Sequence, residues 1–123
     1  MQDPPTVTEL LDATAAFLRE VAVPQLSGHA SFHARVAANA LDIVKRELEL
    51  RPAAEFDEHS RLKALLRADG SLEELNSLLS RRIAAGELGL QTPGLAEHLW
   101  ATTLAKVAID QPTYASYRRE TGT

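Results

Sequence analysis

At 123 residues the chain is long enough for one domain that buries its own core, and its lack of cysteine excludes disulfides, thiolate catalysis and cysteine-based zinc sites. The net charge is −4, and Lys and Arg are interspersed among Asp and Glu, which argues against a nucleic-acid-binding surface. Alanine and leucine dominate while aromatic residues make up 5%, a composition that favours helices over sheets.

The amino-terminal residues 1–11 contain no basic stretch and no long apolar run, so they do not resemble an export signal. No segment has the continuous apolar length that a membrane span requires. We therefore expect a cytoplasmic protein that does not bind membranes. Residues 1–5, which include two prolines, and residues 120–123 are expected to be frayed ends.

The first helix is predicted to begin at Thr6. Glu9 follows three residues later, which is the spacing of a capping box, where each side chain bonds the other residue's free backbone N–H. Apolar residues at helical spacing continue as far as Val21. Pro24 should then end or kink this helix.

Residues 29–50 are predicted to form a long central helix, about 33 Å in length, around which the rest of the chain packs. Its apolar residues fall on two adjacent stripes that cover more than half of the circumference, so several neighbours should surround it. The stripes are Phe32, Val36, Ala40, Ile43 and Leu50, and Ala37, Leu41, Val44 and Leu48. The residue before a proline is pushed away from helical geometry, so Pro52 should end this helix near Leu50.

A narrow polar stripe remains on the central helix, and Asn39 is its unusual member. The stripe consists of Arg35, Asn39, Asp42, Arg46 and Glu49. Asn competes with the backbone for hydrogen bonds and prefers caps or turns, yet Asn39 stands in the middle of a helix among small alanines. We favour a polar partner on a neighbouring helix, because buried polar groups usually find protein partners. The alternative is a contact with a ligand.

A third helix is predicted to begin near Pro52, with Phe56, Leu62, Leu65 and Leu66 facing inward. Ser71 and Glu74 form a second capping box, which opens a fourth helix. Gly86 is expected to close that helix in left-handed geometry.

Thr92 and Pro93 are expected to open a fifth helix that runs to about Asp110, with Trp100 in the core. Residues 113–119 should form a last short turn of helix. The sequence therefore predicts an all-α fold, a compact antiparallel bundle of about five helices around the long central helix. Residues 1–123 are expected to form a single helical domain.

One polar cluster is the candidate binding site. If the fifth helix packs on the central helix, Lys106 and Asp110 could meet Arg35, Asn39, Asp42 or Arg46. The favoured interpretation is an interhelical salt-bridge network, because such networks often specify one packing. The alternative is a pocket for an anionic ligand such as a phosphate or carboxylate.

Metal binding and catalysis have weaker signals. His29 and His33 are four residues apart and could share a metal on one helix face, but the Glu that zinc proteases place directly after the first His is missing. Surface or capping roles are therefore favoured for these histidines. No nucleophile with a base, phosphate-binding glycine loop or pair of acids appears. We assign no catalytic residue, metal or cofactor, and the sequence favours a non-enzymatic role.

Three segments carry a family resemblance: QDPPTVTELL at residues 2–11, FHARVAANALDIVKREL at residues 32–48 and TTLAKVAIDQPTY at residues 102–114. They resemble a small uncharacterised bacterial family of all-helical proteins, a domain of unknown function, and the resemblance spans nearly the whole chain. It brings no catalytic residues. Members occur near genes for acyl-CoA dehydrogenases and aminoglycoside-phosphotransferase-like kinases, so the resemblance implies an accessory role beside an acyl-CoA-handling or kinase-like enzyme.

Two functional hypotheses result. The first is a non-catalytic accessory or interaction protein, such as a homodimer or the partner of an acyl-CoA dehydrogenase or kinase-like protein, because the apolar bundle pattern is uninterrupted by catalytic groups. The second is a small-molecule binder or enzyme with an anion-accepting pocket between the central and fifth helices, lined by Arg35, Asn39, Arg46 and Lys106. A helix-turn-helix regulator is disfavoured, because no basic recognition helix is present.

Overall fold

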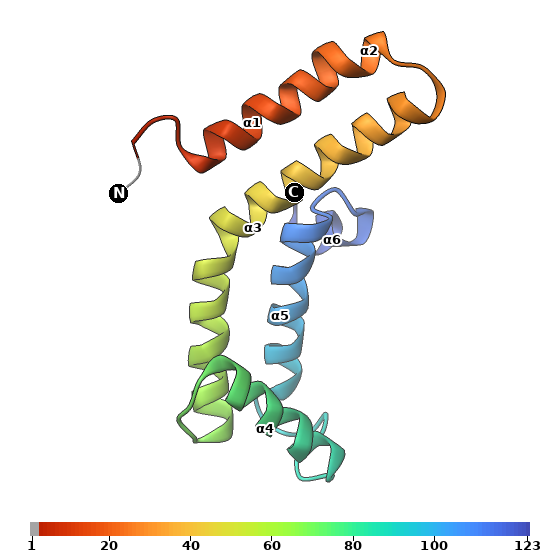
Figure 1. Cartoon of the computed structure of the whole chain (residues 1–123). Coiled ribbons are helices and arrows are strands. Elements are labelled where there is room, and N and C mark those ends of the chain that lie inside the picture. The colour runs from red at the N-terminus through yellow and green to blue at the C-terminus, as the bar shows by residue number, and fades with distance from the viewer. Residues whose placement is uncertain (1–2) are drawn as a thin grey trace. The chain divides into compact units, whose positions relative to one another are not determined.

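The computed structural model describes residues 3–123, and these residues form helices, turns and loops without a strand. The elements are α1 (Val7–Phe17), the π-helix η1 (Leu18–Ala22), α2 (Val23–Gln25), α3 (Gly28–Leu66), α4 (Leu72–Ala84), α5 (Leu95–Asp110) and α6 (Ala115–Thr121) (Figure 1). The predicted all-α fold with a long central helix is therefore confirmed.

The chain comprises two units. Unit 1 spans residues 1–49 and unit 2 spans residues 50–123, so α3 contributes its first half to one and its second half to the other. That residues 1–123 form one domain stays a prediction. Met1 and Gln2, in the first predicted frayed end, lie outside the described residues, whereas Glu120 and Thr121 of the other end belong to α6.

The first helical run begins where the sequence predicts. The Thr6 hydroxyl accepts a hydrogen bond from the Glu9 N–H at 3.2 Å, which is the first half of the predicted capping box. After α1 the helix widens into η1, in which the Val23 N–H reaches the Leu18 carbonyl. Pro24 follows directly, and a proline that removes an N–H from the helical ladder commonly accompanies such a distortion. As predicted, the helix ends close to Pro24.

The central helix is longer than the sequence predicts. α3 continues through Pro52 to Leu66, so the prediction that it ends near Leu50 is wrong. A proline removes one helical hydrogen bond but leaves the flanking bonds intact, and the two alanines that follow Pro52 are good helix formers. Arg51 and Glu55 also pair across this turn at 2.6 Å. None of the helices within residues 3–123, α3 included, is apolar over a length that could cross a membrane.

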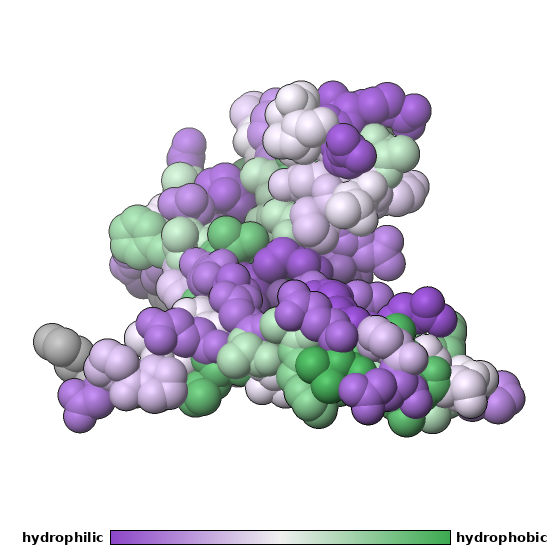
Figure 2. Space-filling model, turned by 90° about the horizontal axis from the view of Figure 1, so that it is seen from above, coloured by the Kyte–Doolittle hydropathy of each residue, from purple (hydrophilic) through white to green (hydrophobic). Residues whose placement is uncertain are grey.

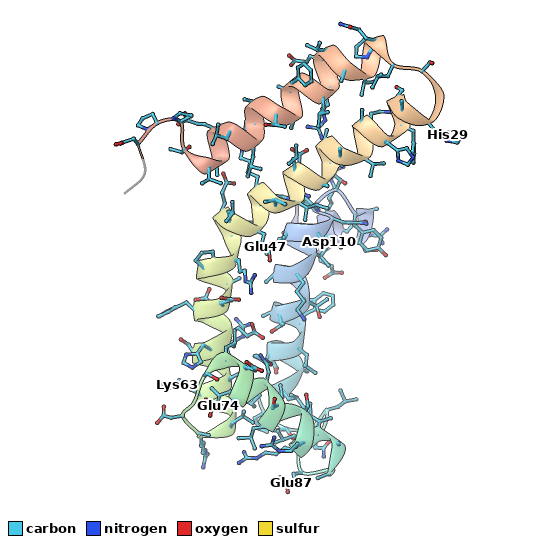
Figure 3. The ribbon with its side chains drawn as sticks, in the orientation of Figure 1. His29, Glu47, Lys63, Glu74, Glu87 and Asp110 are labelled. Atoms are coloured by element: carbon cyan, nitrogen blue, oxygen red, sulfur yellow. The ribbon has the colours of Figure 1, made fainter. Side chains whose placement is uncertain are left out.

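The second capping box opens α4. The Ser71 hydroxyl accepts the Glu74 N–H at 3.1 Å, and the Glu74 carboxylate accepts the Ser71 N–H at 3.4 Å. Figure 3 labels Glu74 in the first turn of this helix. Gly86 has a φ of +77°, so the predicted left-handed residue at the end of α4 is also confirmed.

α5 begins two residues later than predicted. Its cap is Gly94, whose φ of +89° suits a residue without a side chain, and Thr92 does not cap the helix. The Thr92 hydroxyl instead accepts the Gly89 N–H at 2.9 Å and so holds the preceding loop. α5 ends at Asp110, as predicted, and the short helix α6 follows.

The core of unit 2 is a cluster of leucines. Its buried members are Leu62, Leu66, Leu75, Leu79 and Leu95. They come from the second half of α3, from α4 and from the start of α5. α5 runs antiparallel beside the second half of α3 (Figure 1), and Arg61 reaches across to His98 and Thr102. The inward positions predicted for Leu62, Leu65 and Leu66 are thus confirmed.

Two predicted core aromatics are exposed. Phe56 is 72% exposed and Trp100 is 53% exposed, so both predictions are wrong. At about 100° per residue, Phe56 lies about 120° around the helix from the buried Leu62, and Trp100 lies about 160° from the buried His98, so neither shares the buried side. Spacing alone did not say which side would meet a neighbour.

The apolar stripes of the central segment are also more exposed than predicted. The exposed fractions of the following side chains lie between 42% and 56%: Phe32, Val36, Val44, Leu48 and Leu50. The prediction that neighbours surround residues 29–50 on most sides is therefore wrong. Within unit 1 the neighbour of this segment is the helical run of residues 7–25, and one helix covers only part of the circumference.

Candidate functional site

Unit 1 is a helical hairpin, in which residues 7–25 run antiparallel to the first half of α3 (Figure 1). Polar contacts fix the pairing at both ends. The Lys45 ammonium donates to both carboxylate oxygens of Asp12 at 2.9 Å. Near the connection between the helices, the Ser31 hydroxyl donates to the Val23 carbonyl at 3.3 Å.

A polar cluster joins the two helices in the middle of the hairpin. Arg19 donates to the Asn39 side-chain oxygen at 2.8 Å and to the Asp42 carboxylate at 2.6 Å. Asn39 thus has the partner on a neighbouring helix that the sequence predicts, although Asn39 is exposed and not buried. The hydrogen bond from Arg19 holds the pKa of Asp42 below its ordinary value. Because both charged side chains are partly exposed, the pair stabilises the hairpin by about 1 kcal/mol or less.

The contact between the two helices is made of small residues. Among residues 3–49, the buried hydrophobic side chains are Ala15, Ala34 and Ala38. Alanines let two helix backbones approach closely, but they remove little apolar surface from water. The internal contact of the hairpin therefore leaves its larger apolar side chains outside.

The exposed side of the first helix has coiled-coil spacing. Val7, Leu10, Thr14 and Phe17 are separated alternately by three and four residues, and Val21 continues the spacing into η1. All five residues are exposed. This alternation is the heptad pattern by which one helix packs against another. The described structure of unit 1 leaves the pattern without a neighbour.

The first half of α3 separates polar and apolar residues on either side of its contact with α1. Counted at about 100° per residue from the buried Ala34, the residues Ala37, Val44 and Leu48 lie on one side of that contact. By the same count, Arg35 and Arg46 lie on the other side. The contact line with α1 is therefore also the boundary between an apolar and a polar flank.

The apolar flanks of the two helices belong to the same face of the hairpin. In an antiparallel pair, equal angular offsets from the contact line point to the same face, because a two-fold axis normal to the hairpin exchanges the helices. Counted from the buried Ala15, Val7 and Thr14 are rotated about the α1 axis in the same direction as Ala37 and Val44 are rotated about the α3 axis. We call the resulting surface the apolar face, and it consists of Val7, Leu10, Leu11, Thr14, Phe17, Leu18, Val21, His33, Val36, Ala37, Ala40, Leu41, Val44, Glu47 and Leu48.

By the same count Glu47 falls between Ala40 and Val36, so it is the one member of the apolar face with a formal charge among the described residues of the hairpin, and the other polar members are Thr14 and His33. Seven of its larger side chains are between 42% and 56% exposed, namely Val7, Leu10, Phe17, Val21, Val36, Val44 and Leu48. Half of the surface of such side chains comes to roughly 80 Å² each, so the face offers on the order of 600 Å². Hydrophobic residues also reach the surface along the amino-terminal segment in the space-filling view (Figure 2).

The residues of the predicted polar cluster divide between the two units. Arg35, Asn39 and Arg46 belong to the first half of α3, where Arg35 is exposed and Arg46 is half-buried. Lys106 and Asp110 belong to α5 in unit 2, and Figure 3 labels Asp110. That the five residues form one site stays a prediction.

Lys106 and Asp110 line a shallow hollow of about 260 Å³ on unit 2. Its other lining residues are Val107, Gln111 and Tyr114, so the hollow lies over the end of α5 and the connection to α6. One ammonium and one carboxylate at the same rim nearly cancel in charge. This hollow therefore does not favour an anion.

The two histidines that the sequence offered as metal ligands share one side of α3 at its start. The ring centroids of His29 and His33 are 6.5 Å apart, and Figure 3 labels His29 beside the connection from α2. Within residues 3–123, no three His, Asp or Glu side chains gather in a way that could hold a metal ion. Their placement fits the favoured surface role.

Sequence reasoning missed two features. It recognised the helical spacing that ends at Val21 but did not predict that the large side chains of this face would be exposed. It also missed a contact between Arg61 and His98 in unit 2, for which no local signal exists because the two residues are far apart in the chain.

Comparison with known proteins gives one family match. Residues 24–114 match the family described as Domain of unknown function (DUF6285). No curated protein and no solved structure matches the chain. The matched segment includes the whole of α3, α4 and α5, but not α1, η1 or α6.

Proposed function

The chain belongs to the DUF6285 family, whose model covers well over half of it, and we propose that it is a non-catalytic interaction protein that forms a homodimer through the apolar face. The observation that carries the proposal is the largely apolar, exposed character of this face across two helices. A role beside an acyl-CoA-handling or phosphotransferase-like enzyme remains a prediction that rests on the sequence resemblance.

The composition of the apolar face supports pairing between two copies. In a two-fold dimer the same patch meets itself, so a patch with charges of one sign would meet the same sign on the other copy. The apolar face has no guanidinium or ammonium group and a single carboxylate, Glu47, toward its outer edge, so little charge of one sign meets itself.

The size of the apolar face also suits a dimer. The estimate of about 600 Å² per copy, from the larger side chains alone, approaches the roughly 800 Å² per partner of a stable interface. Contiguous apolar patches of this size on a monomer commonly mark an interaction surface.

The geometry that results is a common one. Two antiparallel hairpins that pack face to face form a four-helix bundle, with coiled-coil positions in the bundle core. Leu10 and Phe17 of one copy would then lie among Val44 and Leu48 of the other. The charged pair Asp12–Lys45 would stay at the polar flank, in water.

A charge placed on the apolar face tests the proposal. We expect the wild-type chain to sediment at twice the mass of its 13.4 kDa monomer at micromolar concentration. Leu10→Glu and Val44→Glu should each give monomers, because each change buries two carboxylates in the symmetric interface. Glu9→Lys is the control, since Glu9 is exposed and lies by the same count on the side of α1 away from the apolar face, and it should remain a dimer.

Two other occupants of the apolar face, unit 2 of the same chain or a different protein, are outcomes of the same measurement. A wild-type chain that is monomeric at 100 times the working concentration would refute the homodimer. Hydrogen exchange on the purified monomer then distinguishes the two remaining occupants. Unit 2 would protect the amides of the apolar face in that sample, whereas a foreign partner is absent from it and would leave them unprotected. Dimers in all three variants would equally contradict the proposal.

A further inference from the structure

The side of α5 that faces away from α3 carries a row of uncharged side chains. Arg61 of α3 donates to His98 and to Thr102 of α5 at 3.2 Å, so these two residues mark the side that faces α3. At about 100° per residue, the opposite side of α5 carries residues at spacings of four, three and four: Ala96, Trp100, Thr103 and Val107. We call these four residues the α5 row.

Much of the α5 row is in contact with water. Trp100 is 53% exposed, Ala96 and Thr103 are exposed, and Val107 is half-buried. Leu99 lies beside the row and is 42% exposed. The alternation of four and three residues is the heptad pattern by which one helix packs against another. The exposure of Trp100 shows that the described chain leaves this pattern without a neighbouring helix.

We propose that the α5 row pairs with the α5 row of a second copy, in antiparallel orientation about a two-fold axis. The four positions are symmetric about the midpoint between residues 101 and 102. Trp100 therefore faces Thr103 of the other copy, and Val107 faces Ala96 of the other copy. Each large side chain meets a small one, which lets the two helices pack closely at every layer. A parallel pair would instead place two tryptophans in one layer and two alanines in another.

The charges beside the α5 row favour the same orientation. Glu97 and Lys106 lie on opposite flanks of the row. In the antiparallel pair, Glu97 faces Leu104 of the other copy, and Lys106 faces Leu99 of the other copy. The two copies of each charged residue are then seven residues, or about 10 Å, apart along the helix axis, so their repulsion is weak. A parallel pair would set Asp110 against Asp110 at the next position of the row.

The size of the α5 row predicts a weak contact. The exposed surface of Trp100 and Leu99, with smaller contributions from the rest of the row, comes to on the order of 400 Å² per copy, about half of the roughly 800 Å² per partner of a stable interface. Contacts of this size are typically transient, so we expect the pairing at high concentration. This inference does not rest on the dimer proposed above, because every residue of the row belongs to unit 2.

Trp100 is the only tryptophan of the chain, so its fluorescence reports the contact directly. The test uses the full chain with Leu10→Glu, which blocks the apolar face. As the concentration rises from about 10 µM to about 1 mM, the emission should shift to shorter wavelength, and the sedimentation mass should rise from 13.4 kDa toward twice that value. Unchanged emission, or a mass that stays at 13.4 kDa, would overturn the proposal. Failure of the apolar-face dimer is read separately, in the wild-type chain at micromolar concentration.

A carboxylate on the α5 row should prevent the pairing. In the Leu10→Glu background, Thr103→Glu places a charge opposite Trp100 of the other copy and retains the tryptophan, so emission and mass should stay those of the monomer at every concentration. Ser77→Glu is the matched control, since Ser77 is a small, exposed polar residue of α4, and it should pair as the background does. Equal behaviour of the two variants contradicts the proposal.

Single cysteines test the orientation, because the chain contains none. In the antiparallel pair the two Thr103 positions are three residues, or about 4.5 Å, apart along the axis, and the two Ala96 positions are eleven residues, or about 16 Å, apart. A short bismaleimide should therefore cross-link Thr103→Cys and not Ala96→Cys, both in the Leu10→Glu background. Cross-linking of both variants would indicate a parallel pair, and cross-linking of neither would exclude the contact. Either result overturns the proposal.

Discussion

Replacement of Leu75 by Ala should destabilise unit 2 by about 3 to 4 kcal/mol. Leu75 is 1% exposed and belongs to the leucine cluster that joins α4 to α3 and α5. The loss has two parts. Removal of the buried methyl and methylene groups costs roughly 2 to 3 kcal/mol in transfer free energy, and a residual cavity of a few tens of Å³ adds about 1 kcal/mol. The free energy of unfolding of a small domain is about 5 to 15 kcal/mol, so the variant loses a large fraction of its stability.

The assay is urea unfolding followed by circular dichroism at 222 nm, with amide hydrogen exchange to locate the loss in α4 and the neighbouring turns. Leu90→Ala is the matched control, because Leu90 is 87% exposed and the same atoms are removed from a position in water. The control should change the free energy of unfolding by less than about 0.5 kcal/mol. Equal losses in the two variants, or a loss below about 1 kcal/mol for Leu75→Ala, would refute the leucine core described for unit 2.

Two further predictions concern the cap of α4 and the titration of His98. Ser71→Ala removes the acceptor of the Glu74 N–H and should cost about 1 kcal/mol in urea unfolding, whereas Ser77→Ala, at an exposed position inside the helix, should cost nothing. Because burial and Arg61 lower the pKa of His98 from 6.5, the unfolded chain binds a proton that the folded chain resists, so the free energy of unfolding should fall as the pH drops through 6.5. His98→Gln should flatten this dependence between pH 7.5 and pH 5.5, and an unchanged slope would contradict the stated cause.

The helix starts and ends that could be predicted from sequence depend on residues within one turn of each other. Thr6, Ser71 and Gly86 act on backbone groups three or four positions away, so their neighbours in the chain decide the outcome. Pro52 and Thr92 were different. A proline can end a helix or be carried within one, and a threonine can cap a helix or hold a loop, so the choice depends on contacts that local sequence does not contain.

The candidate sites show the same division. The sequence indicated that Asn39 needs a polar partner on a neighbouring helix, but the identity of that partner, Arg19, depends on how two helices are aligned along each other. His98 and Arg61 lie 37 positions apart, and only the packing of α5 on α3 brings them together. Periodicity also gave both apolar stripes of residues 29–50 without saying which of them would meet a neighbour.

The width of those stripes is the reason for placing the function on the apolar face. Single exposed apolar residues are ordinary on any protein and need no explanation. Here two independent patterns agree, since α1 carries a coiled-coil seam and α3 carries apolar residues on the matching side of the same contact line. The two helices contact each other through the small side chains of Ala15, Ala34 and Ala38. The charged contacts between the helices lie on the polar flank. A hairpin built only to hold itself together would bury its large side chains between its helices, and this one turns them outward.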